Sequence, residues 1–206
     1  MARGMRALEA DRLERLLPVV PWIDVEPTVL WCTAPAWADA LRPHFCEERS
    51  RDEFHFDRAR APTTAKLPAG YRLCPLDEEL AARWGDGLDP WLIRVWGGPA
   101  GFVEHAFGVA VLHGEDLVAD CAACAIGGPR GDAEAEVEIA TAPDHRRRGL
   151  AMAAAVVFFE QCRERDLKPA WTCDSRNEAS RLLAKELGFT YFRSVVGFRL
   201  RRDALA

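Results

Sequence analysis

The sequence predicts a mixed α/β fold, in which helices pack on the faces of a sheet that contains antiparallel and parallel strands. Residues 107–126 read as two apolar strands joined at residues 113–116, where Gly114 supplies the turn geometry of an antiparallel hairpin. From residue 135 onward strands alternate with helices, which is typical of crossover connections between strands. Early hairpins and late crossovers together indicate a mixed sheet.

The first third of the chain predicts a small α/β extension. Its expected elements are two helices and one strand, at residues 8–17, 34–45 and 29–32. A polar stretch from Glu47 to Lys66 follows, and we place a domain boundary there. The prediction is an N-terminal extension over residues 1–65 and a main domain over residues 66–206.

The main domain is expected to contain strands and helices in alternation after its first hairpin. Asp77 is placed to cap a helix, and the glycines near residue 98 interrupt a second helical segment. Gly188 is placed to end the last helix. The remaining expected strands are residues 71–75, 135–141, 169–173 and 190–200, and the expected helices are residues 76–84, 89–105, 148–165 and 177–187.

Composition excludes several classes of protein. The net charge is -5, and the largest cationic cluster, residues 146–148, is too small for a nucleic-acid interface. The longest apolar run, residues 149–159, is shorter than the roughly 20 residues that span a bilayer. Residues 1–15 lack an apolar signal core, so we expect a cytoplasmic protein without membrane or nucleic-acid partners.

Seven scattered cysteines do not resemble a disulfide framework or a zinc site. Cys121 and Cys124 form a CxxC pair, but they lie in an expected strand. A spacing of three places their side chains on opposite faces of the sheet. We therefore expect buried thiols, not a redox or metal site.

The strongest chemical signal is the sequence RRRGLA at residues 146–151, between a strand that ends at Thr141 and a long helix. The first amides of a helix are free and carry the positive end of its dipole, which suits phosphate groups. Gly149 allows close backbone approach, Ala151 is small, and the arginines add charge. The segment predicts a diphosphate-binding loop.

Two segments resemble the GNAT superfamily of N-acetyltransferases. VEIATAPDHRRRGLA (137–151) is similar to the family's strand and pyrophosphate loop, and SRNEASRLLAKELGF (175–189) is similar to its later signature. The resemblance covers about residues 70–200. It implies a splayed central sheet flanked by helices, acetyl-CoA as cosubstrate, and acetyl transfer to a primary amine.

The same resemblance implies which residues hold acetyl-CoA. The backbone of Ile139, Ala140 and Thr141 would pair with the pantetheine arm as a missing strand does. Asn177 would reach the pantetheine or serve as a helix cap. The implied pyrophosphate contacts are Arg146, Arg147, Arg148, Gly149, Leu150, Ala151 and Met152.

Acetyl transfer to an amine needs a base, a polarised thioester carbonyl and a proton for the leaving thiolate. Glu138 and Glu136 lie on one face of the motif strand and are the base candidates, with solvent exposure of both as the alternative. Asp174 is a third candidate. The carbonyl role falls to the backbone amide of Ile139 or Ala140.

The chain departs from the family where relatives carry an acidic tyrosine, four residues before the closing glycine. Ala184 stands there, which leaves Cys173, Ser180 or Tyr191 as the acid, or no dedicated acid, the reading we favour. The departure also supports an alternative function, a non-catalytic acyl-CoA sensor or interaction domain.

The sequence leaves two interpretations open for four aromatic residues of the main domain. They either line an acceptor pocket or pack in the core, and we expect the core; they are Trp91, Trp96, Phe102 and Phe107. His145, beside the loop, is expected to be a surface residue. The extension either covers the acceptor site or forms a homodimer, and the acceptor, a small molecule or a peptide amine, is not identified by the sequence.

Overall fold

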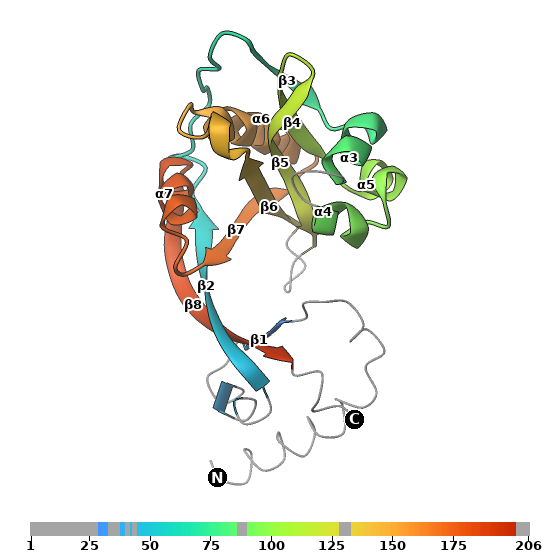
Figure 1. Ribbon diagram of the computed structural model, residues 1–206. Coiled ribbons are helices and arrows are strands. Elements are labelled where there is room, and N and C mark those ends of the chain that lie inside the picture. Colours follow the sequence, from blue (N-terminus) through green and yellow to red (C-terminus); the bar gives the residue numbers. More distant parts are fainter. Residues whose placement is uncertain are drawn as a thin grey trace. The chain divides into compact units, whose positions relative to one another are not determined.

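The computed structural model describes residues 29–32, 38–39, 42, 45–85, 90–127 and 133–200 (Figure 1). The helix expected at residues 8–17 lies outside the described residues, and most of the helix expected at residues 34–45 does too. The chain forms two compact units. The first comprises residues 1–53, 173–178 and 192–206, and the second comprises residues 54–172 and 179–191.

The second unit is built on a mixed sheet, as predicted. Its strands are β3 (Tyr71–Pro75), β4 (Gly108–His113), β5 (Asp116–Ile126), β6 (Glu134–Thr141) and β7 (Lys168–Asp174), in the spatial order β7-β6-β5-β4-β3. The pairs from β3 to β6 are antiparallel, whereas β6 and β7 are parallel. The predicted hairpin and the predicted crossover are therefore both present.

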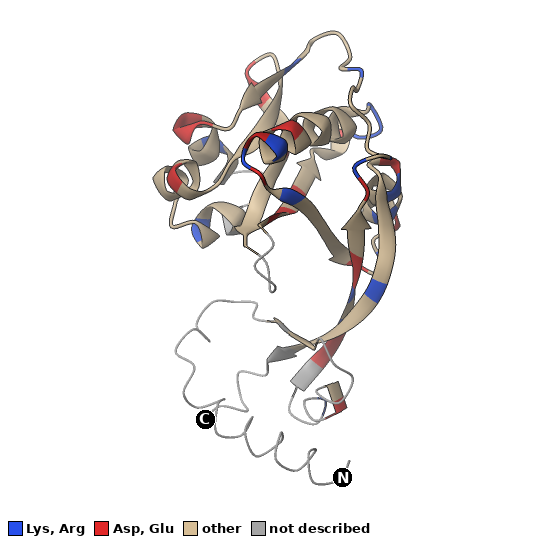
Figure 2. Ribbon diagram, turned by 180° about the vertical axis from the view of Figure 1, so that it is seen from behind, with Lys and Arg blue, Asp and Glu red and all other residues tan. Residues whose placement is uncertain are grey.

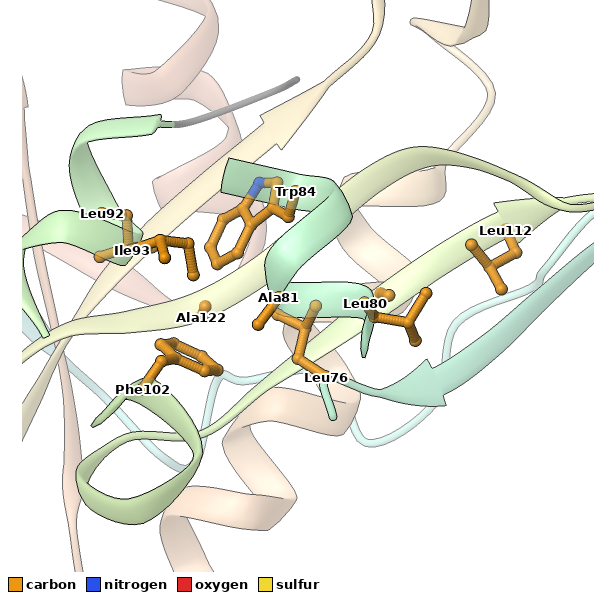
Figure 3. Packing of buried hydrophobic residues seen from close by; sticks show 10 residues of the cluster. Leu76, Leu80, Ala81, Trp84, Leu92, Ile93, Phe102, Leu112 and Ala122 are labelled. Carbon is orange, nitrogen blue, oxygen red and sulfur yellow. The ribbon is translucent and has the colours of Figure 1, made fainter. Parts of the chain in front are cut away.

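Three short helices pack on this sheet, α3 (Glu78–Gly85), α4 (Pro90–Val95) and α5 (Pro99–His105). The Asp77 carboxylate accepts a hydrogen bond from the Leu80 amide at 2.9 Å, so the predicted cap is confirmed. Trp84 and Phe102 are fully buried and meet edge to face, with ring centroids 5.9 Å apart. Figure 3 shows these side chains packed with Ala122 of the sheet.

A long helix, α6 (Leu150–Glu164), packs against β4, β5 and β6. Phe158 of this helix stacks on Phe107, with ring centroids 5.1 Å apart. Phe102 and Phe107 are thus both core residues, as expected. The helix begins one residue after Gly149, slightly later than the sequence suggested, because Gly149 occupies the N-cap position.

The two CxxC cysteines belong to opposite faces of β5, as the strand alternation predicted. The Cys121 thiol lies near Cys162 of α6, and burial raises its pKa well above the usual value. Cys124 instead packs against the cluster formed by α3, α4 and α5. Burial also raises the pKa of the Cys162 thiol to about 12. Both buried thiols stay protonated and unreactive near neutral pH.

The last part of the second unit, residues 179–191, contains most of α7 (Glu178–Glu186) and the first residues of β8 (Phe189–Leu200). Gly188, predicted to end the helix, has a φ of 91°. A Cβ at Gly188 would lie 2.7 Å from the backbone nitrogen of Ala61, so this turn requires glycine.

The first unit contains one strand that the sequence did not predict. The predicted strand, β1 (Val29–Cys32), pairs antiparallel with the second half of β8. The unpredicted strand is β2 (Phe45–Phe56), which occupies much of the polar stretch where we expected a domain boundary. The Asp52 carboxylate on β2 is 2% exposed and accepts hydrogen bonds from the hydroxyls of Ser175 and Ser194, at 2.6 and 2.7 Å. Polar side chains that satisfy one another explain why this strand lacks an apolar signal.

Charged residues of both signs are spread over the described ribbons (Figure 2). In the part of the chain that the structure describes, no helix is long and apolar enough to cross a membrane.

Candidate active site

The sheet of the second unit opens into a fork at β6 and β7. Within the described chain, the two strands pair only from Glu134–Glu136 on β6 to Lys168–Ala170 on β7. β6 then continues to Thr141 without a partner on its β7 side, and Figure 1 shows the strands diverging. Beyond Glu136, β6 is therefore an open strand edge on its β7 side, along the stretch that includes Ile139, Ala140 and Thr141.

The N-terminus of α6 follows directly after this fork. Gly149 adopts a left-handed conformation, with φ 78° and ψ 9°, and among the described residues no side chain caps the helix. The first helical backbone bond runs from the Ala153 amide to the Gly149 carbonyl, at 3.0 Å. The amides of the preceding turn, Leu150 to Met152, therefore point out of the helix without an intrahelical acceptor. Such amides form an anion-binding site.

Three exposed arginines directly precede this helix end, and two of them make hydrogen bonds within the fold. Arg146 donates to the Thr141 carbonyl at 3.0 Å, and Arg148 donates to the Asp144 carbonyl at 3.1 Å. Arg147 has a φ of 58°, which is uncommon for a residue with a side chain. The three arginines thus stand in the chain directly before Gly149 and the free amides of α6.

The two candidate glutamates of β6, Glu136 and Glu138, are both half-buried, but they differ in position along the fork. The Thr172 hydroxyl of β7 donates to the Glu136 carboxylate at 2.6 Å, across the closed end of the fork. Glu138 lies two residues further toward the open end, opposite Ala122 of β5. Of the two predicted base candidates, Glu138 thus has the position nearer the open fork.

Asp174, the third base candidate, belongs to the first unit and is held by Arg176. Hydrogen bonds from the Arg176 side chain and amide lower the pKa of the Asp174 carboxyl to about 2. A carboxylate with so low a pKa binds a proton weakly near neutral pH. This makes Asp174 a poor general base.

The residues considered for the acid role have varied surroundings. Ala184 is fully buried in α7, and the Ser180 hydroxyl accepts a hydrogen bond from Trp171 Nε1 at 3.2 Å. Tyr191 is 52% exposed, and Cys173 is half-buried in the first unit. None of these contacts assigns an acid, so the absence of a dedicated acid stays a prediction.

Asn177 directly precedes α7 and lies in the first unit. Its backbone amide donates to the backbone carbonyl of Asp174 at 2.8 Å. Its side chain is at the position of a helix cap. Its contact with the pantetheine stays a prediction.

Sequence reasoning missed one group of residues beside the loop. The Tyr71 hydroxyl on β3 lies 2.9 Å from His145 Nδ1 and 3.1 Å from Arg148 Nη1. His145 is half-buried and contacts Tyr71, a contact that the sequence did not predict. Tyr71 and His145 are 74 positions apart, and no local pattern could have paired them.

Comparison with known proteins gives the family. The model of the GNAT acetyltransferase family matches residues 29–197. The uncharacterised N-acetyltransferase YdfB of Bacillus subtilis is 30% identical over 163 residues, which are 78% of this chain and 61% of YdfB. The chain thus spans about three fifths of that relative.

Solved structures share the fold. A GCN5-related N-acetyltransferase-like protein from Streptococcus suis has a TM-score of 0.68 at 22% identity, over 84% of this chain and 71% of that one. A GNAT-family acetyltransferase from Colwellia psychrerythraea has a TM-score of 0.59 at 14% identity, over 86% and 66% of the two chains. With its matched family model, its forked sheet and its uncapped loop-to-helix turn, the chain belongs to the GNAT acetyltransferase family.

Proposed function

We propose that this chain is an N-acetyltransferase that moves the acetyl group of acetyl-CoA to a primary amine. The observation that carries the proposal is the forked end of β6, followed within a few residues by the uncapped N-terminus of α6. An extended arm can pair with the unpartnered strand edge, and a diphosphate can bind the helix amides, as acetyl-CoA requires.

The residues present fit this cosubstrate. Along the stretch Ile139 to Thr141, the backbone groups that point away from β5 lie on the open edge of β6, although the Thr141 carbonyl already accepts from Arg146. The space on the missing Cβ side of Gly149 is open, since a Cβ there would come no closer than 3.9 Å to its nearest neighbour, the Lys66 carbonyl oxygen. Arg146, Arg147 and Arg148 complement the negative charge of the two phosphates.

Acetyl-CoA supplies the acetyl group as a thioester. The acceptor nitrogen forms a bond to the acetyl carbon, and the bond from that carbon to sulfur breaks. We assign to Glu138 the removal of the proton from the acceptor nitrogen, and to the backbone amide of Ile139 or Ala140 a hydrogen bond to the thioester oxygen. Glu138 takes the proton that turns the acceptor ammonium into a neutral amine and returns it to solvent. After the attack, the positively charged nitrogen passes one further proton to the departing thiolate, directly or through water, which completes the balance.

Glu138 is preferred to Glu136 because it lies two residues nearer the open end of the fork, whereas Thr172 contacts Glu136 at the closed end. Glu136 is then assigned to support the fork.

Steady-state release of CoA thiol with a panel of primary amines tests the proposal. The panel should include an aminoglycoside, a polyamine, free amino acids and peptides with a free N-terminus. We expect at least one amine to raise thiol release above the rate without amine, with an acetylated product of the expected mass. Saturable CoA binding without turnover on any amine would instead favour the acyl-CoA sensor.

A further inference from the structure

We propose that Tyr71 is a positioning residue for the cofactor loop, because its hydroxyl orients the Arg148 guanidinium toward the start of α6. This inference rests on the proposed function, since it assumes that the loop binds the diphosphate of acetyl-CoA. It adds a residue on β3, 77 positions away from Arg148 and outside both sequence segments that resemble the family.

The geometry holds Arg148 at two points. Arg148 Nη1 donates to the Tyr71 oxygen at 3.1 Å, and Arg148 Nη2 donates to the Asp144 carbonyl at 3.1 Å. Both terminal nitrogens of the guanidinium are therefore engaged, although the side chain is on the exposed surface. A guanidinium held in this way keeps a fixed plane, and Arg148 directly precedes Gly149 and the free amides at the start of α6.

The direction of the hydrogen bonds follows from the donors that are present. A guanidinium can only donate, so the Tyr71 oxygen accepts from Arg148. The same Tyr71 oxygen lies 2.9 Å from its other neighbour, His145 Nδ1, within hydrogen-bond distance. Tyr71 thus links β3 to His145 and Arg148, which flank Arg146 and Arg147.

Ring packing fixes the phenol itself. The Tyr71 ring lies 4.8 Å from the His113 ring, its direct partner in the β3–β4 register. It also meets the His145 ring nearly at right angles, at 5.8 Å. His113 and His145 are 5.4 Å apart, so the three rings form one group. A phenol held by two rings can orient Arg148 before a ligand arrives.

Pre-orientation matters because an arginine side chain loses much conformational freedom when it binds a ligand. If Tyr71 already restricts the Arg148 side chain in the free protein, that side chain loses less conformational entropy when CoA binds. Tyr71 should therefore affect the affinity for CoA through Arg148 and not by touching the diphosphate.

A double-mutant cycle tests this dependence. Affinity for CoA is measured by titration calorimetry on the wild type, Tyr71→Phe, Arg148→Met and the double variant. Phenylalanine keeps the ring packing and removes the hydroxyl, and we expect it to weaken CoA binding about three- to tenfold. In the Arg148→Met background, the same change should cost less than about twofold, since its partner is gone.

A kinetic readout separates positioning from a general structural role. Tyr71→Phe should raise the KM for acetyl-CoA and leave kcat within about twofold. Arg72→Gln is the matched control, because Arg72 is the next residue on β3 and its guanidinium pairs with Glu115 instead of the loop. It removes a nearby positive charge and should leave CoA affinity within about twofold of the wild type.

The outcomes are distinguishable. If the wild type does not bind CoA at all, the proposed function fails and this inference fails with it. If the wild type binds CoA but Tyr71→Phe does not weaken binding, only the role of Tyr71 is overturned. An equal loss in both arginine backgrounds would also overturn it, because Tyr71 would then act independently of Arg148.

Discussion

The Thr172 hydroxyl donates a 2.6 Å hydrogen bond to the Glu136 carboxylate, and this bond crosses from β7 to β6 where the two strands stop pairing. It marks the closed end of the fork. Glu138, two residues further along β6, is left toward the open end. The two glutamates share a strand face but differ in position along the fork, so we expect their variants to behave differently.

Glu138→Gln should lower kcat for amine acetylation about 100- to 1000-fold, because the amide cannot accept the proton that the amine must lose. CoA affinity should change by less than about twofold, since the side chain is not assigned to the cofactor loop. Glu136→Gln should reduce kcat much less. Stopped-time assays at saturating amine, with calorimetry for CoA, measure both. A larger loss in Glu136→Gln would reverse the assignment of the base.

Gly149→Val should abolish measurable CoA binding. A β-branched residue is strained at the φ of 78° that Gly149 adopts, and its side chain would fill the approach to the helix amides. Gly114→Val is the matched control, because Gly114 has a φ of 61° and also has open space around a Cβ. Both variants should have a lower melting temperature than the wild type. Only in Gly149→Val should CoA fail to raise the melting temperature as it does in the wild type.

Ala184→Tyr tests whether the missing tyrosine is a lost acid. Ala184 is fully buried in α7, so the larger ring would overpack the core and cost at least about 1–3 kcal/mol of stability. We expect no gain in kcat. Leu182→Tyr, at a position that is 53% exposed on the same helix, should leave the stability nearly unchanged. A stable Ala184→Tyr protein with higher kcat would show that the acid role was vacant.

Phe102→Ala should destabilise the protein by about 3–5 kcal/mol, because it removes a fully buried ring that packs against Trp84. Val103→Ala, one residue along α5 and 46% exposed, should change the free energy of unfolding by less than about 0.5 kcal/mol. Urea unfolding measures both. Similar values for the two variants would contradict the assignment of Phe102 to the core.

Arg176→Gln should raise the pKa of Asp174 from about 2 toward the ordinary carboxyl value, because it removes the main hydrogen-bond donor. A folded-state pKa below the unfolded one contributes stability above about pH 4. That contribution is lost as the pH falls from about 4 to about 2, and the variant should lack it. Carboxyl NMR titration measures the shift. Arg94→Gln, an exposed arginine on α4, should leave the Asp174 titration unchanged.

The sequence predicted most elements of the second unit because their signals are local. The hairpin at Gly114, the cap at Asp77 and the helix end at Gly188 each depend on a few neighbouring residues. β2 was missed because its buried Asp52 is satisfied by Ser175 and Ser194, which are distant in sequence. Apolar periodicity cannot reveal a strand whose buried positions include hydrogen-bonded polar residues.

By itself, the sequence determined the mixed fold, the loop at residues 146–151 and the pair of candidate glutamates, since each is written in a contiguous segment. Only the tertiary structure decided where β6 and β7 separate, which glutamate Thr172 holds, and that Tyr71 contacts Arg148. The reason is physical. Helix starts and turns are fixed by backbone geometry within a few residues. The separation of β6 from β7, the hydrogen bond from Thr172 to Glu136 and the contact of Tyr71 with Arg148 instead depend on segments brought together from distant positions in the chain.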